Sequence, residues 1–293
     1  MATREELYAA LDEYKSALAA RDPAQLDWAE GHFVTENNVA LAAGDGVWNT
    51  ITALGPYDLR FADVAHGQVA LFTCVEETDA VSPMAIRLKV TNGQIAEVET
   101  VVARNKDEGF PFLGQSFEPK PAMEAEVPDR ERCTREELIR LANGYFETIE
   151  RNDGTLATRF HPDCNRVENG GQTTNNGGFP LPIARLGCEE QFRLGWYRYD
   201  DELRARRFPL VDVERGIVVG SGFFDHANEW DRYNLTDGRE MKTALKWPNS
   251  ITLLEAFRIR DAEISRVEAV FTYVPYFMHN PFWGPDSRPP EYA

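Results

Sequence analysis

A repeat inside the chain limits the folds that it can adopt more than any other feature of the sequence. Thr3-Arg4-Glu5-Glu6-Leu7 recurs letter for letter as Thr134-Arg135-Glu136-Glu137-Leu138, an offset of 131 residues (134 − 3). Near the end of each half, residues 89–102 resemble residues 258–271, an offset of 169 (258 − 89). Because the offset grows, we infer two related halves, of which the second carries an insertion.

Each copy of the repeated pentapeptide begins a predicted helix. Thr3 with Glu6, and Thr134 with Glu137, have the spacing of a capping box. Inward-facing residues then recur at i, i+4, i+7 and i+11 in both halves: Leu7, Leu11, Tyr14 and Leu18 in the first, and Leu138, Ala142, Tyr145 and Ile149 in the second. This spacing is typical of an amphipathic helix with one buried face.

Extended segments follow each predicted helix. Residues 89–102 read as two β runs around Asn92-Gly93, a strong hairpin signal, and residues 258–271 as two runs around Asp261-Ala262. A helix followed by consecutive strands predicts an α+β fold with antiparallel sheets, because parallel sheets need helices between their strands. In the second half we also expect a long polar helix over residues 188–203, before the last strands.

These patterns divide the chain into four predicted segments. Residues 1–107 form a first domain, and residues 108–132, rich in Pro and charge, form a linker. Residues 133–275 form a second domain. Residues 276–293 form an aromatic and proline-rich tail, which we expect to cover either a cavity mouth or a subunit contact.

Charge and motif content narrow the classes of partner. A formal net charge of −17 would repel phosphate backbones and anionic lipid, so we expect no nucleic-acid or membrane partner. No signal peptide or membrane span is recognisable, which predicts a cytoplasmic protein. The four cysteines are far apart and are expected to be mostly buried thiols. Because no metal-ligand spacing or nucleotide motif occurs, we predict no metal and no cofactor.

The insertion contains an unusually polar passage, DCNRVENGGQTTNN, at residues 163–176. If this run is extended, Arg166 and Glu168 share one face and Asp163 and Asn165 share the other. In a binding site, Arg166 would orient a hydroxyl or phenolate, and Glu168 or Asp163 would accept a proton. The alternative is that these charges form an ion pair that anchors the loop.

Other candidate residues have a functional and a structural interpretation. His226 is either a general acid or base or a hydrogen-bonded residue of the sheet, and Tyr145 either donates to an oxyanion or packs in the core. Glu99 and Glu268 are bases of raised pKa if they face inward, and solubilise their strands if they face outward. Aromatic residues that could form the walls of a substrate pocket, or simply fill the core, are Trp196, Tyr197, Phe224 and Trp247.

Three patterns carry a resemblance to a known superfamily. They are the opening helix with its inward Tyr, the F-x-x-E/D entry at residues 33–36 and 160–163, and the closing G-x-I-x-x-V-E hairpin at residues 93–99. Together they resemble the nuclear transport factor 2-like superfamily, which includes ketosteroid isomerases, polyketide cyclases and scytalone dehydratase. The resemblance implies two tandem cone-shaped curved sheets, each packed on N-terminal helices around an apolar pocket.

More narrowly, the whole chain is similar to the cofactor-independent lyases that remove formaldehyde from lignin-derived diarylpropane diols. This resemblance implies a small aromatic substrate and release of a stilbene. His226 or Tyr145 would then assist departure of the benzylic hydroxyl, and Asp163 or Glu168 would remove the proton of the primary hydroxyl. An isomerase or dehydratase of steroid or polyketide type, and a non-catalytic binding or scaffold module, are the alternatives. The first half would either support the second or pair with a neighbouring subunit. In the latter case the protein would form a homo-oligomer.

Overall fold

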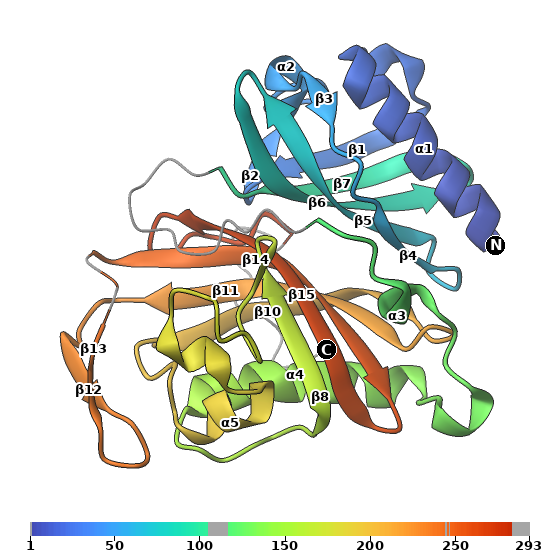
Figure 1. Ribbon diagram of the computed structural model, residues 1–293. Coiled ribbons are helices and arrows are strands. Elements are labelled where there is room, and N and C mark those ends of the chain that lie inside the picture. Colours follow the sequence, from blue (N-terminus) through green and yellow to red (C-terminus); the bar gives the residue numbers. More distant parts are fainter. Residues whose placement is uncertain (1, 105–116, 244, 246, 283–293) are drawn as a thin grey trace.

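The computed structural model describes residues 2–104, 117–243, 245 and 247–282. Figure 1 shows two curved sheets stacked on each other, one from each half of the chain. The first half contains α1 (Arg4–Ala20), β1 (Trp28–Glu36), β2 (Val39–Leu41), α2 (Val47–Thr50), β3 (Ala53–Leu54), β4 (Leu59–Asp63), β5 (Gln68–Glu77), β6 (Ala80–Thr91) and β7 (Gln94–Val102). After α3 (Pro121–Glu124), the second half contains α4 (Arg135–Arg151), β8 (Phe160–Glu168), β9 (Gly171–Gln172), α5 (Cys188–Arg193), β10 (Glu202–Asp212), β11 (Ile217–His226), β12 (Arg232–Asn234), β13 (Glu240–Lys242), β14 (Asn249–Arg260) and β15 (Glu263–Val274).

The two main sheets have the same strand order. The first runs β2-β1-β7-β6-β5, with β3 and β4 both paired to β5, and the second runs β9-β8-β15-β14-β11-β10. In each sheet the first long strand lies parallel to the last one, β1 to β7 and β8 to β15, whereas the other main pairs are antiparallel. The predicted tandem α+β fold is therefore confirmed, with one correction: both sheets are mixed rather than purely antiparallel.

The two long helices begin where the sequence predicts. The Thr3 amide donates to Glu6 at 2.7 Å, and the Glu137 amide donates to the Thr134 hydroxyl at 3.2 Å, so both capping boxes form. The predicted inward faces of α1 and α4 are buried. Figure 1 shows each helix lying across the side of its sheet that faces away from the other sheet. Each half therefore encloses its own interior.

Both predicted hairpin turns are present. Thr91 pairs with Gln94 and Arg260 pairs with Glu263, so each turn has two residues between the paired positions. Asn92 and Gly93 have φ of 53° and 81°, and Asp261 and Ala262 have φ of 53° and 56°. Two positive φ values are what a type I′ turn requires, and they match the right-handed twist of the strands.

The long polar helix predicted over residues 188–203 is wrong. Helix α5 ends at Arg193, and residues from Glu202 onward belong to β10. Gly195 has φ of 63°, and a Cβ on it would lie 2.7 Å from the backbone oxygen of Asn152, so the chain turns sharply there. This turn, residues 195–200, brings several polar and aromatic side chains to the rim of the second domain.

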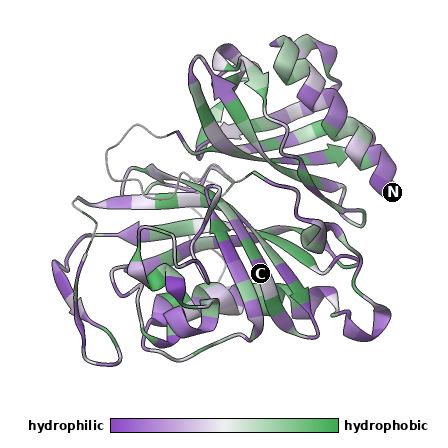
Figure 2. Cartoon of the chain, in the orientation of Figure 1, coloured by the Kyte–Doolittle hydropathy of each residue, from purple (hydrophilic) through white to green (hydrophobic). Residues whose placement is uncertain are grey.

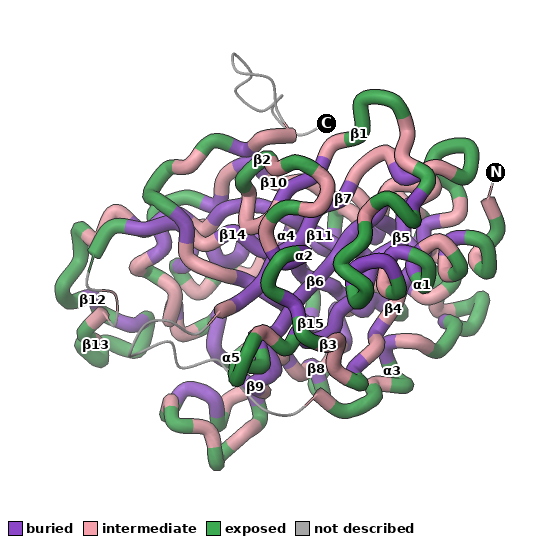
Figure 3. Tube along the Cα trace, turned by 90° about the horizontal axis from the view of Figure 1, so that it is seen from above, coloured by how far each residue is buried: buried purple, intermediate pink, exposed green. Residues whose placement is uncertain are grey.

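The sheets pack on each other through a shared apolar cluster. Figure 2 shows hydrophobic residues concentrated along the strands, and Figure 3 shows buried residues running through the middle of both sheets. Residues of this interface cluster from the first half include Phe61, Phe72, Ala85 and Val101, and those from the second half include Leu210, Ile217, Val219, Leu254 and Val270. The outer faces of the two sheets are therefore buried against each other rather than solvated.

Glu99 and Glu268 lie at this interface, which neither sequence interpretation anticipated. The Glu99 carboxylate accepts from Arg87 at 2.9 Å and from Arg207 of the other half at 2.5 Å. Glu268 accepts from the Tyr57 hydroxyl at 2.6 Å and pairs with Lys120 at 2.9 Å. Both carboxylates are buried but face the opposite domain, so they tie the two halves together.

Because the interface is one buried cluster, we expect the two halves to unfold together. Phe61 is fully buried in the first-half side of this cluster. Replacing Phe61 with Ala should lower the free energy of unfolding by about 3–5 kcal/mol, since it removes a large buried ring and leaves a cavity. Scanning calorimetry should show one transition, shifted to lower temperature. Two separate transitions, of which only one shifts, would contradict this coupling.

The interior of the first half is filled by side chains. Tyr14 of α1 packs edge-on against Trp48 at 5.4 Å between ring centroids, within a cluster of buried aliphatic residues. Trp48 itself lies in α2, a short helix with Gly46 at its start. Tyr14 and Trp48 are therefore core residues of the first half.

Some predictions fall partly outside the described residues. These are the domain limit at residue 107, the start of the linker at 108–116 and the end of the tail at 283–293. Within the described tail, Phe282 packs against Phe33 of the first half at 5.2 Å and lies over the Arg207 guanidinium at 4.2 Å. This part of the tail therefore covers the junction of the two halves. The domain limits stay a prediction.

Three further features concern the chain as a whole. All four cysteines are buried free thiols, as predicted. In the part of the chain that the structure describes, no helix is long and apolar enough to span a bilayer. Within the same residues, no group of three or more His, Cys, Asp or Glu side chains is placed to hold a metal ion.

Candidate active site

A cavity of about 170 Å³ lies in the second half, between α4 and the sheet. Its floor comes from β8, β11, β14 and β15, and its rim from the turn at 195–200 and the hairpin β12–β13. Most of the lining is aromatic or aliphatic, with a few polar side chains among it. This composition is typical of a pocket for a small organic molecule.

Two carboxylates lie in one row across the floor of the cavity. Glu168 of β8 pairs with Ala269 of β15, which in turn pairs with Glu255 of β14. Neighbouring strands are about 4.8 Å apart, so the two glutamate backbones are about 10 Å apart with only a methyl group between them. On the other side of Glu255, the row continues with Gly220 of β11. The ring of Phe146 packs over Gly220, where a Cβ would lie 3.1 Å from it. Glu168, Ala269 and Glu255 all line the cavity.

Glu255 is the most perturbed acid in the cavity. Its side chain is 2% exposed, and Oε2 has no hydrogen-bond partner among the described residues. Burial is the largest cause that raises the pKa of Glu255, the nearby Glu168 also raises it, and Arg166 offsets part of this effect, so that the pKa is about 8. At neutral pH the Glu255 carboxyl group therefore carries a proton.

Arg166 is held on the cavity wall by a full set of acceptors. It is 2% exposed, and it pairs with Glu168 at 3.1 Å. The guanidinium donates to Gln191 Oε1 at 2.6 Å, to the Thr173 hydroxyl at 3.1 Å and to the Tyr197 hydroxyl. Burial lowers the pKa of Arg166, but the surrounding groups, Glu168 first, raise it well above its ordinary value. Arg166 is thus a permanent cation that keeps Glu168 close by.

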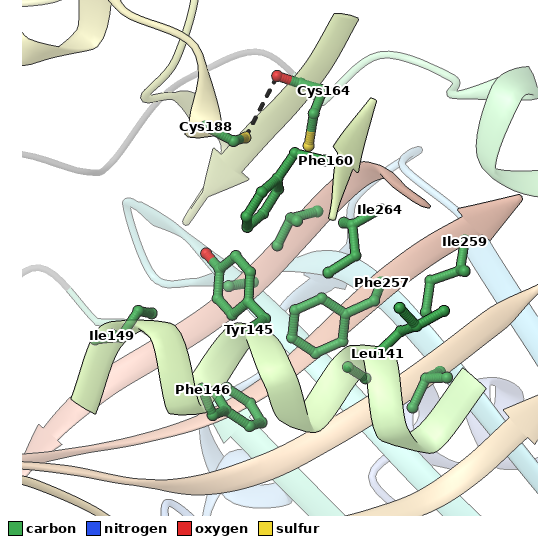
Figure 4. Packing of buried hydrophobic residues seen from close by; sticks show 14 of the residues in the cluster. Leu141, Tyr145, Phe146, Ile149, Phe160, Cys164, Cys188, Phe257, Ile259 and Ile264 are labelled. Carbon is green, nitrogen blue, oxygen red and sulfur yellow. Dashed lines mark hydrogen bonds between the residues drawn. The ribbon is translucent and has the colours of Figure 1, made fainter. Parts of the chain in front are cut away.

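Two phenols complete the inner part of the site. Figure 4 shows Tyr145 rising from α4 with its hydroxyl pointing away from the helix, among Phe160, Phe257 and Ile149. That hydroxyl lies 3.4 Å from Arg166 Nη1. Burial raises the pKa of both Tyr145 and Tyr197 above the ordinary value. Both phenols therefore stay neutral and can donate a hydrogen bond.

His226 lines the cavity, but its ring nitrogens are already occupied. Nε2 lies 2.5 Å from Asp200 Oδ1, and Nδ1 lies 3.2 Å from Asn249 Oδ1. The Asn249 amide is oriented by its own donation to the Trp247 carbonyl at 2.9 Å, so its oxygen faces the histidine. Burial lowers the pKa of His226, and the Asp200 carboxylate raises it by more, so the net shift is upward. Neither nitrogen is left to act on a ligand.

His226 and Glu255 also lie at opposite ends of the cavity. His226 pairs with Asn249 in the β11–β14 ladder, and Glu255 lies six residues further along β14 (255 − 249). At about 3.3 Å per residue, this separation is about 20 Å along the strand. The backbones of the two residues are therefore well separated along the sheet, and both side chains line the cavity.

The structure brings most of the predicted site residues together. Those that line the cavity are Tyr145, Arg166, Glu168, Trp196, Tyr197, Phe224 and His226. Asp163 does not, because its side chain is 82% exposed on the opposite face of β8. Trp247 is half exposed and also lies outside the cavity lining. We therefore leave Asp163 and Trp247 out of the site.

The polar passage at residues 163–176 was predicted either to line a binding site or to be anchored by an ion pair, and the structure shows both features. Arg166 and Glu168 share one face, as expected, and form an ion pair that also lines the cavity. Other residues of the passage hold its own fold: Asn169 donates to the Phe271 carbonyl at 3.0 Å, and Asn175 donates to Asn165 Oδ1 at 2.8 Å. The passage is thus an ordered wall of the cavity.

The sequence reasoning missed Glu255, Gln191 and Asp200. For Glu255 a signal exists, because it is an isolated carboxylate in the apolar run Leu253-Leu254-Glu255-Ala256-Phe257. Buried acidic residues without a partner are rare, so such a position suggests a functional group. Gln191 and Asp200 give no such signal, because their importance depends on contacts with Arg166 and His226 from distant parts of the chain.

Comparison with known proteins finds one family model that matches part of the chain. A family model described as "Domain of unknown function (DUF8021)" matches residues 131–271, which span the second half from α4 to β15. A search of curated proteins finds no match.

Several solved structures are similar to about a third of this chain. A protein of unknown function with a cystatin-like fold from Methylobium petroleophilum is 16% identical, covers 37% of this chain and 82% of its own, and has a TM-score of 0.31. A putative ketosteroid isomerase from Kribbella flavida is 15% identical, covers 36% and 82%, and has a TM-score of 0.30. A putative polyketide cyclase from Xanthomonas campestris is 15% identical, covers 33% and 90%, and has a TM-score of 0.28. The fold assignment itself rests on the strand order described above.

Proposed function

We propose that the second half is an enzyme that moves protons within a small aromatic molecule by general acid and base catalysis with its own side chains. The observation that carries this proposal is the pair of carboxylates in one row. Glu255 holds its proton at neutral pH, whereas Glu168 is paired with the Arg166 guanidinium. Two acids in such different surroundings are suited to act as acid and base in one reaction.

The roles follow from the contacts of each group. Glu168 accepts a proton from a carbon or hydroxyl of the ligand, and Glu255 donates a proton or a hydrogen bond to the oxygen on which negative charge develops. Arg166 and the Tyr145 hydroxyl lie on the same side and stabilise that charge. Phe224 and Trp196 provide aromatic walls for a ring.

The size of the cavity favours a compact ligand. Its volume of about 170 Å³ is smaller than the about 300–1,000 Å³ usual for drug-sized ligands, so it suits a molecule with one substituted ring. Proton transfer next to a carbonyl, as in an isomerase or a dehydratase, is the reaction that such a ligand and this acid–base pair support best.

A second candidate is the removal of formaldehyde from a diarylpropane diol to give a stilbene. The length of the lining favours it, because His226 of β11 pairs with Asn249, about 20 Å along β14 from Glu255, and a two-ring ligand would occupy more of this length. In this reaction Glu168 removes the proton of the primary hydroxyl, and Glu255 protonates the leaving benzylic hydroxyl. The cavity would have to widen to admit both rings.

One pair of assays separates these two reactions. Aryl ketones incubated with the protein in deuterium oxide should exchange the hydrogens next to the carbonyl, which proton NMR detects. A diarylpropane diol should release formaldehyde and a stilbene absorbance if the second candidate holds. In whichever assay shows activity, the variant Glu168→Gln should lower the reaction rate by about a hundred- to ten-thousand-fold. If neither class of compound reacts faster with protein than without it, the proposed enzyme function is wrong.

The rate should also depend on pH in a defined way. The acid form of Glu255 is required, and the pKa of this group is raised to about 8 by burial. We therefore expect kcat/KM to fall as the pH rises through about 8. Measurement of kcat/KM between pH 6 and about 10 checks this. A descending limb that persists unchanged in Glu255→Gln would assign it to another group.

A further inference from the structure

A second hollow lies beside the active-site cavity and has no part in the function proposed above. It has a volume of about 410 Å³ and is bounded by the end of α4, the turn at 195–200 and the hairpin β12–β13. Asp200 and Tyr233 line both hollows and separate them. The second hollow is lined mainly by polar and charged residues, in contrast to the apolar cavity.

Two buried polar atoms in its lining have no partner among the described residues. They are Nδ2 of Asn152, a residue 4% exposed, and Oδ2 of Asp200, a residue 7% exposed. Asn152 Oδ1 accepts from the Tyr197 amide at 3.0 Å, and the Asp200 amide donates to the Tyr197 carbonyl at 2.9 Å. His226 occupies the other Asp200 oxygen. Both residues are held by contacts with Tyr197 in the lining of the hollow, so a donor and an acceptor lack partners there, at a cost that a ligand would offset.

The charges of this lining favour a neutral ligand. Three arginines (Arg151, Arg198, Arg232) balance three acidic residues (Glu150, Asp200, Glu240). Most are also paired: Arg232 with Glu240 at 2.6 Å, Glu150 with Arg206 at 2.5 Å, and Arg151 with Glu147. Arg198 donates to the Asn152 carbonyl at 3.0 Å, so most of the charged groups already have partners, which a neutral ligand would leave in place.

Aromatic faces lie at the same hollow. Trp230 is 53% exposed there, and Tyr233 forms part of the wall. A large exposed indole beside unused buried polar atoms is unusual on a surface that is otherwise acidic and polar. Such a ring offers a flat apolar surface to the C–H face of a saturated ring.

We propose that this hollow binds a neutral polyhydroxylated ring, such as a hexose unit. One hydroxyl donates to Asp200 Oδ2, the neighbouring hydroxyl accepts from Asn152 Nδ2, and the ring packs its apolar face on Trp230. Vicinal hydroxyls meet both requirements, because each hydroxyl can donate and accept. The proposal concerns binding alone and does not depend on the reaction in the neighbouring cavity.

Ligand-observed NMR with methyl β-D-glucopyranoside tests this binding directly. We expect saturable binding of the glucoside, and none of cyclohexanol, which has one hydroxyl. Asn152→Asp keeps the oxygen that holds the Tyr197 amide and removes the donor, so affinity should fall at least tenfold. Trp230→Ala should lower affinity by about tenfold, since it removes the stacking surface. Circular dichroism confirms that each variant is folded.

Trp247→Ala is the matched control, because Trp247 is 50% exposed but lies outside both hollows. This variant should bind the glucoside like the original protein. The proposal is overturned if the glucoside shows no saturable binding or if cyclohexanol binds as well. It is also overturned if neither Asn152→Asp nor Trp230→Ala weakens binding more than Trp247→Ala does.

Discussion

Replacing Glu255 with Gln should stabilise the protein above neutral pH and at the same time remove most of its activity. In the folded protein burial raises the pKa of Glu255 to about 8, whereas the ordinary value, which we take for the unfolded chain, is 4.5. Between these two values the unfolded chain ionises while the folded protein keeps its proton. The stability of the original protein therefore falls as the pH rises from about 4.5 to about 8, and Gln removes this loss.

The expected size of the effect follows from the same shift. A difference of about 3.5 pKa units corresponds to about 5 kcal/mol at pH 8 and above. A buried amide without a partner costs about 1–3 kcal/mol, so a net gain of about 2–4 kcal/mol remains. Urea denaturation of both proteins at pH 5 and pH 8.5 measures this gain, which should appear mainly at the higher pH.

Activity should change in the opposite direction. Gln has the shape of the protonated glutamate but no proton to transfer, so the rate should fall by about a hundred- to ten-thousand-fold. Glu202→Gln serves as the control, because Glu202 is an exposed glutamate of the same sheet. It should alter neither stability nor rate. A Glu255→Gln protein that is less stable than the original at pH 8.5 would contradict the assigned ionisation state.

Replacing Arg166 with Met should destabilise the protein by about 3–5 kcal/mol. Arg166 is 2% exposed, and its removal leaves the Glu168 carboxylate and Gln191 Oε1 without their main donor. Breaking one side of a buried ion pair costs this much because the remaining charge stays buried and uncompensated. Chemical denaturation at pH 7 measures the loss.

A double variant separates the lost ion pair from lost packing. Adding Glu168→Gln to Arg166→Met removes the stranded charge, so part of the stability should return. Arg193→Met is the matched control, since Arg193 pairs with Glu189 at the surface and its side chain is 59% exposed. We expect no measurable change there. If Arg166→Met behaves like Arg193→Met, the Arg166 network does not hold the cavity wall.

The parts of the fold that depend on local chemistry could be predicted from the sequence. Thr3 and Thr134 identify the helix starts because a capping box involves residues three apart. Asn92-Gly93 identifies a hairpin because its two positive φ values suit these residues. The parallel pairing of β1 with β7 could not be predicted, because it joins strands separated by most of a domain.

The same distinction applies to the candidate site. The side-chain alternation along β8 correctly placed Arg166 with Glu168, since strand periodicity is local. The same alternation placed Asp163 on the opposite face of β8. It could not show which of the two faces lines the cavity, so Asp163 was wrongly kept as a candidate base. The role of His226 could not be predicted either, because Asp200 and Asn249 approach it from other segments and occupy both ring nitrogens.

The central claim is that the second half contains a protonated glutamate, Glu255, in the same cavity as the Glu168–Arg166 ion pair. Carbon-13 NMR of the glutamate carboxyl groups, recorded across pH 4 to about 10, tests it most directly. We expect one resonance that titrates near pH 8 and disappears in Glu255→Gln, in agreement with the pKa raised by burial. If every glutamate carboxyl group has lost its proton by pH 6, the acid–base pair does not exist and the proposed function fails with it.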